Sequence, residues 1–188
     1  MKVTLILVTS LDGRITEGDK PGAGSWASPE DQEVFLSQIE AHDCIVMGST
    51  TYEAARSIIK PSANKPRIVL TRTPQRFASE RQPGLEFLAI SPQEVIRRAE
   101  NNGYKSLLLV GGARTNARFL DADLVDELSV TIEPLLFGAG TPFVAALRQT
   151  LHLQLLSCKQ INSQGALLAR YRIQKFNQGP YIHENKEI

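Results

Sequence analysis

Residues 106–120 read SLLLVGGARTNARFL, and this stretch decides the fold class. The apolar run at residues 107–110 has the length of a strand. A strand that is covered by helices on both faces needs a continuous run of apolar residues. Gly111 and Gly112 follow directly, and the segment after them is helix-like. A strand, a glycine turn and a helix in this order form the repeating unit of a parallel α/β sheet.

The same alternation continues toward the N-terminus. Short apolar runs, separated by helix-like or loop segments, occupy residues 3–8, 44–47, 67–70 and 85–90. Helix starts are marked at Ser28 and Ser91, because each is followed by Pro and then, at the third helical position, by an acidic residue. Another helix is expected after Gly48. These segments predict a largely parallel sheet.

Toward the C-terminus the pattern changes to period-two segments without a long helix between them, at residues 127–134, 151–161 and 166–176. This pattern predicts that the sheet finishes with antiparallel strands. We therefore expect one three-layer α/β domain over residues 1–176, with a mostly parallel central sheet and antiparallel C-terminal strands. Residues 177–188 are polar and are expected to form a tail.

Composition limits the function classes. The chain has 188 residues, enough for one sizeable core, and 21 Lys and Arg against 20 Asp and Glu, so no one-sign field favours nucleic acid or a membrane surface. No apolar stretch approaches the roughly 20 residues that cross a bilayer. Cys44 and Cys158 are the two cysteines, and neither they nor the three histidines have metal-ligand spacing. We expect a cytoplasmic protein with a small-molecule ligand and no metal.

Glycine turns provide the first candidate ligand site. In an open α/β sheet, ligands bind beyond the carboxyl ends of the strands. Gly48 and the Gly111–Gly112 pair lie between a strand and a helix, where a missing side chain lets a phosphate approach backbone N–H groups. Two such turns can hold one pyrophosphate. The alternative is that these glycines only make tight turns.

A second candidate is the segment after the strand at residues 67–70. Thr71 and Arg72 offer a hydroxyl and a guanidinium, which are groups that bind a phosphate monoester such as the 2′-phosphate of NADPH. A solvated loop is the alternative.

Two carboxylates are candidates for catalysis or for binding a substrate ring. Asp12 follows the first strand, and Asp31 lies in the first turn of the helix that starts after Ser28. Each has a structural alternative: Asp12 with Gly13 suits a turn, and Asp31 can complete a capping box and favour the helix dipole.

Together, the motifs of this chain resemble a known family. SLDGRI at 10–15, CIVMGSTTYEA at 44–54, PRIVLTR at 66–72, LLLVGGARTNARFL at 107–120 and LVDELSVTIEPLLFGAGTPF at 124–143 follow its order and spacing. Over about residues 2–174 the chain resembles the reductase domain of riboflavin-biosynthesis deaminase-reductases, in the dihydrofolate reductase-like superfamily. The resemblance implies a dihydrofolate reductase-like fold. It also implies hydride transfer from NADPH to 5-amino-6-(5-phosphoribosylamino)uracil, whose ribose opens to a ribityl chain.

The resemblance also implies roles for particular residues, and a homodimer. The expected cofactor-binding residues are Gly48, Ser49, Thr51, Thr71, Arg72, Gly111, Gly112, Ala113 and Arg114. The expected substrate-side residues are Ser10, Gly13, Trp26 and Ser28, with Asp12 and Asp31 as candidate catalytic carboxylates. Asp31 gains support from dihydrofolate reductases, where a Trp, a Pro, an acid and a Phe open the first long helix. Trp26, Pro29, Asp31 and Phe35 have that spacing.

The chain also departs from the pyrimidine-reductase pattern. Val110 stands where an acid usually precedes the paired glycines, and Ile6 stands where many members have Lys. The helix sequence PEDQEVFLSQIEA contains no Lys or Arg, although related enzymes use Arg there for the substrate phosphate. Two alternatives therefore stay open, namely a reductase of dihydrofolate or another pterin, and an NADPH-binding protein without turnover.

Overall fold

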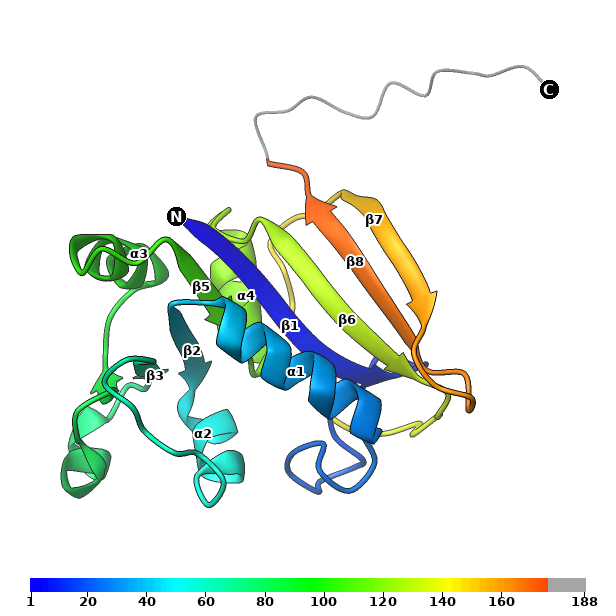
Figure 1. Ribbon diagram of the computed structural model, residues 1–188, viewed down its shortest axis with the longest axis horizontal. Coiled ribbons are helices and arrows are strands. Elements are labelled where there is room, and N and C mark those ends of the chain that lie inside the picture. Colours follow the sequence, from blue (N-terminus) through cyan, green and yellow to red (C-terminus); the bar gives the residue numbers. More distant parts are fainter. Residues whose placement is uncertain (176–188) are drawn as a thin grey trace.

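The computed structural model describes residues 1–175, so the tail predicted over 177–188 lies outside the described residues. An eight-stranded sheet in the order β4-β3-β2-β5-β1-β6-β8-β7 forms the centre of the molecule (Figure 1). The strands are β1 (Lys2–Ser10), β2 (Cys44–Gly48), β3 (Arg67–Leu70), β4 (Leu85–Leu88), β5 (Ser106–Leu109), β6 (Glu127–Glu133), β7 (Leu153–Gln160) and β8 (Leu167–Ile173). The helices are α1 (Pro29–Ala41), α2 (Ser49–Ala55), α3 (Pro92–Asn101) and α4 (Ala113–Asp121), with a 3₁₀ segment, η1, at Pro74–Glu80.

Strand directions confirm the prediction of a mostly parallel sheet. The six strands from β4 to β6 in the sheet order, namely β4-β3-β2-β5-β1-β6, all run parallel to one another. β8 is antiparallel to β6, and β7 is antiparallel to β8. β6 has one partner of each kind, because it is antiparallel to β8 on one side and parallel to β1 on the other. The physical reason for the parallel pairing is the connection through α4, since a crossover helix returns the chain in the same direction.

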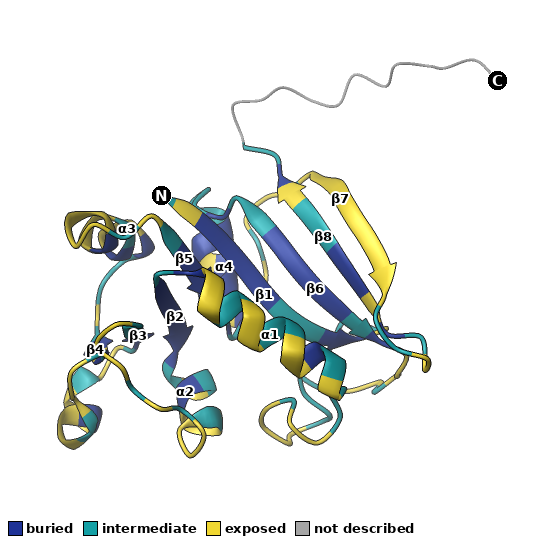
Figure 2. Cartoon of the chain, in the orientation of Figure 1, coloured by how far each residue is buried: buried dark blue, intermediate teal, exposed yellow. Residues whose placement is uncertain are grey.

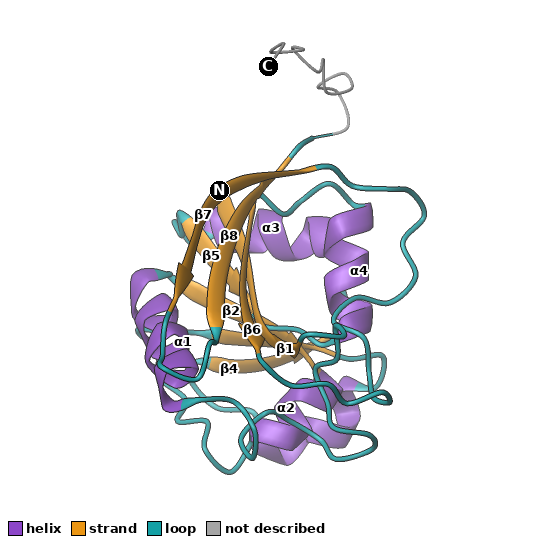
Figure 3. Ribbon diagram, turned by 90° about the vertical axis from the view of Figure 1, so that its right-hand side faces the viewer, coloured by secondary structure: helices purple, strands orange, loops and turns teal. Residues whose placement is uncertain are grey.

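Helices cover both faces of the sheet. α1 lies on one face and α3 and α4 lie on the other, with α2 at the edge where β2 ends (Figure 3). Alternate residues of β2 separate two apolar clusters: Val46 packs on the side of α3 and α4, while Ile45 and Met47 pack on the side of α1. The central strands β2, β3 and β5 are therefore buried on both faces, as their continuous apolar character predicted.

Two features of the fold bear on function. Every residue of β7 is exposed, although the strand is rich in leucine (Figure 2). None of the helices within residues 1–175 has the length and apolar character that crossing a membrane requires.

Candidate active site

The two glycine turns form one structural unit at the carboxyl edge of the sheet. The Gly48 amide donates to the Gly111 carbonyl at 2.8 Å, which joins the end of β2 to the turn after β5. Gly111 has φ +100°, a conformation that favours glycine, and the Gly111–Gly112 peptide is cis. The sequence predicted two glycine turns at the carboxyl ends of strands, and the structure places them on neighbouring strands in direct contact.

Threonine hydroxyls surround this unit. A Cβ atom added to Gly48 would lie 2.5 Å from Thr115 Oγ1, and one added to Gly112 would lie 3.1 Å from Thr51 Oγ1. Glycine is therefore required at Gly48 by the approach of a side chain from α4, in addition to any requirement of the turn. Gly112 also places no side chain before the start of α4, where the helix dipole favours an anion.

Asn116 is a polar residue of this site that sequence reasoning missed. It is only 1 % exposed, and its Nδ2 donates to the Phe143 carbonyl at 2.7 Å. Its Oδ1 is buried and has no hydrogen-bond partner among residues 1–175, and a Cβ on Gly111 would lie 3.9 Å from it. A buried acceptor without a partner costs free energy, so such a group in a native protein invites a ligand or water as explanation. The available signal was an Asn between Ala113 and Ala117, on the apolar side of the helix.

Phe143 connects the glycine turns to the substrate side. Its amide donates to the Gly13 carbonyl at 3.2 Å, while its carbonyl accepts from Asn116. Gly13 has φ +76°, and its amide donates to the Ser10 carbonyl at 2.9 Å. Phe143 thus links Asn116 of α4 to Gly13 and Ser10 on the predicted substrate side.

The Asp12 carboxylate accepts three hydrogen bonds from its surroundings. Ser10 Oγ donates to Oδ1 at 2.6 Å, and the amides of Phe137 and Gly138 donate at 3.1 and 2.9 Å. These bonds stabilise the charged form, with that from Ser10 first, and lower the pKa of Asp12 to about 2. The side chain therefore ties the turn after β1 to the loop after β6, and it is a poor proton donor at neutral pH.

Asp31 has the opposite environment. It is 7 % exposed, and burial raises its pKa, while the Thr131 side chain lowers it and the charge of Glu133 raises it further. Ser28 Oγ accepts from the Asp31 amide at 3.3 Å, so Ser28 caps α1 as predicted. The expected capping box is not formed, because the Ser28 amide donates to Glu133 Oε1 at 2.9 Å and not to Asp31. Glu133 is a second residue that sequence reasoning missed.

Trp26 lies beside the loop that Asp12 holds. Its ring contacts Phe137 edge to face, with centroids 5.1 Å apart. Its Nε1 is buried without a partner among the described residues. Among the predicted substrate-side residues, Trp26 therefore carries a buried donor without a partner in residues 1–175.

Thr71 and Arg72 lie at the end of β3, apart from the contacts described above. The Thr71 amide donates to the Leu88 carbonyl at 3.0 Å, and Thr71 Oγ1 accepts from the Thr73 amide at 3.2 Å. Arg72 and Arg114 are exposed, and neither forms an ion pair within residues 1–175. Both guanidinium groups are accessible to a phosphate.

Ile6 and Val110, the two departures from the pyrimidine-reductase pattern, are core residues. Ile6 is buried in the cluster on the α1 side, and Val110 packs against the same cluster. The charged groups that the pattern has at these positions are replaced by apolar packing.

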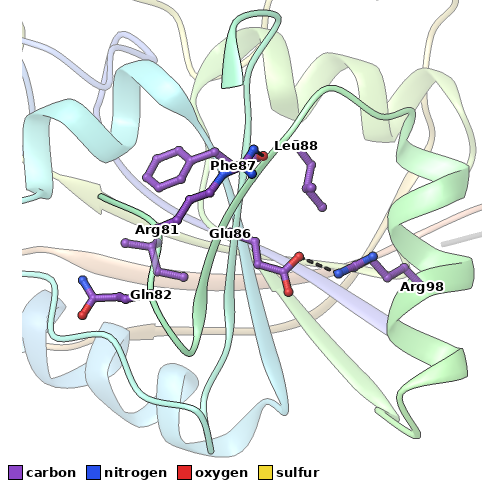
Figure 4. Close-up of a pocket in the computed structure, with 7 residues that line it drawn as sticks. Arg81, Gln82, Glu86, Phe87, Leu88 and Arg98 are labelled. Atoms are coloured by element: carbon purple, nitrogen blue, oxygen red, sulfur yellow. Dashed lines mark hydrogen bonds and ion pairs between the residues drawn. The ribbon is translucent and has the colours of Figure 1, made fainter. Parts of the chain in front are cut away.

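A hollow of about 500 Å³ lies elsewhere, along β4 (Figure 4). Glu86 and Arg98 form an ion pair across it at 2.6 Å, and it contains no predicted site residue. Over residues 1–175 no group of three or more His, Cys, Asp or Glu is placed to hold a metal ion.

The topology is that of the dihydrofolate reductase-like fold. A dihydrofolate reductase from Enterococcus faecalis, solved with NADP(H), has a TM-score of 0.63 and 19% identity, covering 93% of this chain and 97% of that one. The family model of the RibD C-terminal domain matches residues 1–167, so the chain belongs to that family.

Two further comparisons agree with this membership. The chain is 25% identical over 164 residues to the uncharacterized protein YwjB of Bacillus subtilis, which covers 85% of this chain and 91% of YwjB. A diaminohydroxyphosphoribosylaminopyrimidine deaminase/5-amino-6-(5-phosphoribosylamino)uracil reductase from Thermotoga maritima has a TM-score of 0.71 and 17% identity. That match covers 91% of this chain and 56% of the Thermotoga chain. The resemblance inferred from the motifs is confirmed, and the chain is reductase-like.

Proposed function

We propose that this protein is an NADPH-dependent reductase of a ribosylamino-pyrimidine, acting on 5-amino-6-(5-phosphoribosylamino)uracil or a close relative. The observation that carries the proposal is the joined pair of glycine turns, with the partnerless Oδ1 of Asn116 beside it. Membership of the RibD C-terminal domain family supports the reaction class.

The residues at the carboxyl edge fit a dinucleotide cofactor. Gly48 and Gly112 keep side chains out of the space before α4, and Asn116 Oδ1 offers an acceptor to a ligand N–H or O–H group. We propose that the cofactor diphosphate is held by Gly48, Ser49, Thr51, Gly111, Gly112 and Ala113. Thr71, Arg72 and Arg114 would hold the phosphate at the adenosine end. NADPH bound there supplies the hydride.

The substrate side then binds the pyrimidine and provides a proton. Ser10, Gly13, Trp26 and Ser28 would line it. Hydride transfer adds two electrons and one hydrogen, so one proton must also reach the product. Asp31 suits that role because burial raises its pKa, and a proton donor needs a pKa nearer the working pH. We assign Asp12 to positioning, since its carboxylate is already occupied by Ser10 and two amides.

A pterin reductase is the second candidate, and Asp31 is the observation that favours it. A buried acid in the first turn of α1, with Trp26 before it, is the arrangement that the comparison with dihydrofolate reductases predicted. The apolar packing of Ile6, which is buried, and of Val110, which is partly buried, favours the third possibility, a binder without turnover.

One set of measurements separates the three. Titration with NADPH, followed by nicotinamide fluorescence, tests for the cofactor site. Oxidation of NADPH is then followed with the ribosylamino-pyrimidine and, separately, with dihydrofolate. Turnover of the pyrimidine alone supports the main proposal, and turnover of dihydrofolate alone replaces it. Binding without either turnover identifies a silent binder, and failure to bind NADPH rejects all three.

We also propose that the protein is a homodimer in a reducing cytoplasm. Cys44 and Cys158 form no disulfide with each other, which agrees with a reducing compartment. Leu155 is 54 % exposed on β7, an edge strand whose outer side has no partner within residues 1–175. A second copy of this chain would cover that edge.

A further inference from the structure

The starts of α1 and α3 have the same residue order but different hydrogen bonds. At α3, Ser91 Oγ accepts from the Glu94 amide at 3.2 Å, and Glu94 Oε2 accepts from the Ser91 amide at 2.7 Å. This is a complete capping box. At α1 only half of the box is present, because the Ser28 amide donates to Glu133 Oε1 at the end of β6.

Glu133 thus performs, from a distant part of the sequence, a task that a nearby acid could perform. It is 4 % exposed, and burying a carboxylate is costly. The Asp31 carboxyl, in contrast, accepts no bond from the Ser28 amide and faces Thr131 of β6. The Ser28 amide is satisfied by Glu133, so the Asp31 carboxyl is not used to cap its own helix.

We propose that Glu133 is a positioning residue, which takes the Ser28 amide and so keeps the Asp31 carboxyl directed toward the substrate side. The inference rests on the proposed role of Asp31 in the reductase. Among residues 1–175, Glu133 of β6 is the charged group that acts on the Asp31 carboxyl, whereas the N-cap Ser28 bonds only to the Asp31 amide.

Removal of the acceptor is the first test. In Glu133→Leu, Asp31 can turn to the Ser28 amide and complete the capping box. It then gains a bond to its charged form and loses a like charge, so its pKa should fall by roughly one unit or more. Carboxyl-carbon NMR of the ligand-free protein measures this shift without reference to any reaction. An unchanged Asp31 pKa in folded Glu133→Leu overturns the proposal.

Turnover provides the second readout. We expect Glu133→Leu to lower kcat by roughly tenfold or more, because a misdirected group reacts poorly. Glu133→Gln retains an acceptor for the Ser28 amide and should keep kcat within about threefold. If Glu133 acts through Asp31, adding Glu133→Leu to Asp31→Asn should cause no further loss of kcat. Independent, multiplying losses contradict the proposal.

Glu94→Leu is the matched control. It breaks the complete box of α3 and should lower thermal stability with kcat unchanged. If Glu133→Leu behaves in the same way, with kcat unchanged and only stability lowered, Glu133 is a structural cap. Should the protein turn over neither candidate substrate, the NMR titration still decides the inference, whereas the proposed function fails.

Discussion

Asp12 and Asp31 are two aspartates at one edge of the sheet with opposite environments. Hydrogen bonds from Ser10 and from two amides hold Asp12 in its charged form. Burial disfavours the charged form of Asp31. Paired acids whose pKa values are moved apart commonly divide the roles of proton donor and charged anchor. These environments support the proposed roles, in which Asp31 donates the proton and Asp12 is the charged anchor.

Replacement of Asp31 by Asn separates catalysis from stability. We expect turnover to fall roughly a hundredfold, the scale of a lost general acid. The folded pKa lies above the unfolded one, so the contribution of Asp31 to stability is greatest below the ordinary 3.8 and falls as pH rises through the raised value. Asp31→Asn should therefore be as stable as the parent at neutral pH, or more stable. Urea unfolding and steady-state rates measure the two effects, and normal turnover leaves Asp31 without a catalytic role.

Arg72 should determine the preference for NADPH over NADH. A charge-assisted contact contributes about 1.5 to 3 kcal/mol, so Arg72→Ala should remove roughly tenfold or more of the preference. Fluorescence titration with both cofactors measures it. Arg97→Ala, another exposed arginine but on α3, is the control and should change neither affinity. Equal affinities of the parent for NADPH and NADH reject the assignment.

At the scale of elements, the joined turns after β2 and β5 should respond as one site. Gly112 has φ −83°, which a branched residue adopts, but its Cβ would lie 3.1 Å from Thr51 Oγ1. The side chain of Gly112→Val would occupy the space that a phosphate needs before α4, so the variant should lose NADPH binding. Because valine adopts this φ, the melting temperature should change little. Gly24→Val is the control, because nothing lies within 4 Å of a Cβ there. Normal binding by Gly112→Val would make Gly112 a turn residue only.

The contribution of the loop after β6 to protein stability should depend on pH, because Asp12 holds this loop. The pKa of Asp12 is lowered from 3.8 to about 2, so its contribution to stability is present above the higher value and is lost as pH falls through the lower one. Asp12→Asn should be less stable than the parent at neutral pH, and the difference should vanish near about pH 2. Denaturant unfolding across this range checks it. A difference that persists at the acid end contradicts the assignment.

At the scale of the whole molecule, local sequence patterns predicted the helices and strands. They did not predict contacts between residues far apart in the sequence. The Ser-Pro pattern located the starts of α1 and α3, and continuous apolar runs located the parallel strands. The same local pattern suggested a capping box for Asp31, which does not form because the Ser28 amide donates to Glu133, 105 residues further along the chain. The role of Asn116 was not predicted for a similar reason, since its burial depends on the contact of α4 with Phe143, which is distant in the sequence.

Dimer formation through β7 is the prediction that concerns the complete molecule. Leu153, Leu155 and Leu156 are 39 %, 54 % and 39 % exposed on a strand whose outer backbone groups have no partner among the described residues. An uncovered apolar edge strand promotes association, and a stable interface buries about 800 Å² per partner. An eight-residue strand is about 26 Å long, so pairing of two copies along it can form the centre of such an interface.

Light scattering after gel filtration should find a dimer for the parent and a folded monomer for Leu155→Glu, because a charge would be buried between the strands. Leu36→Glu introduces the same charge at an exposed leucine of α1 and should remain dimeric. Circular dichroism checks that both variants are folded. A parent protein that is monomeric at all concentrations, or a Leu155→Glu variant that stays dimeric, excludes β7 as the interface. Because the glycine turns follow β2 and β5 and not β7, NADPH affinity should be unchanged in the monomer.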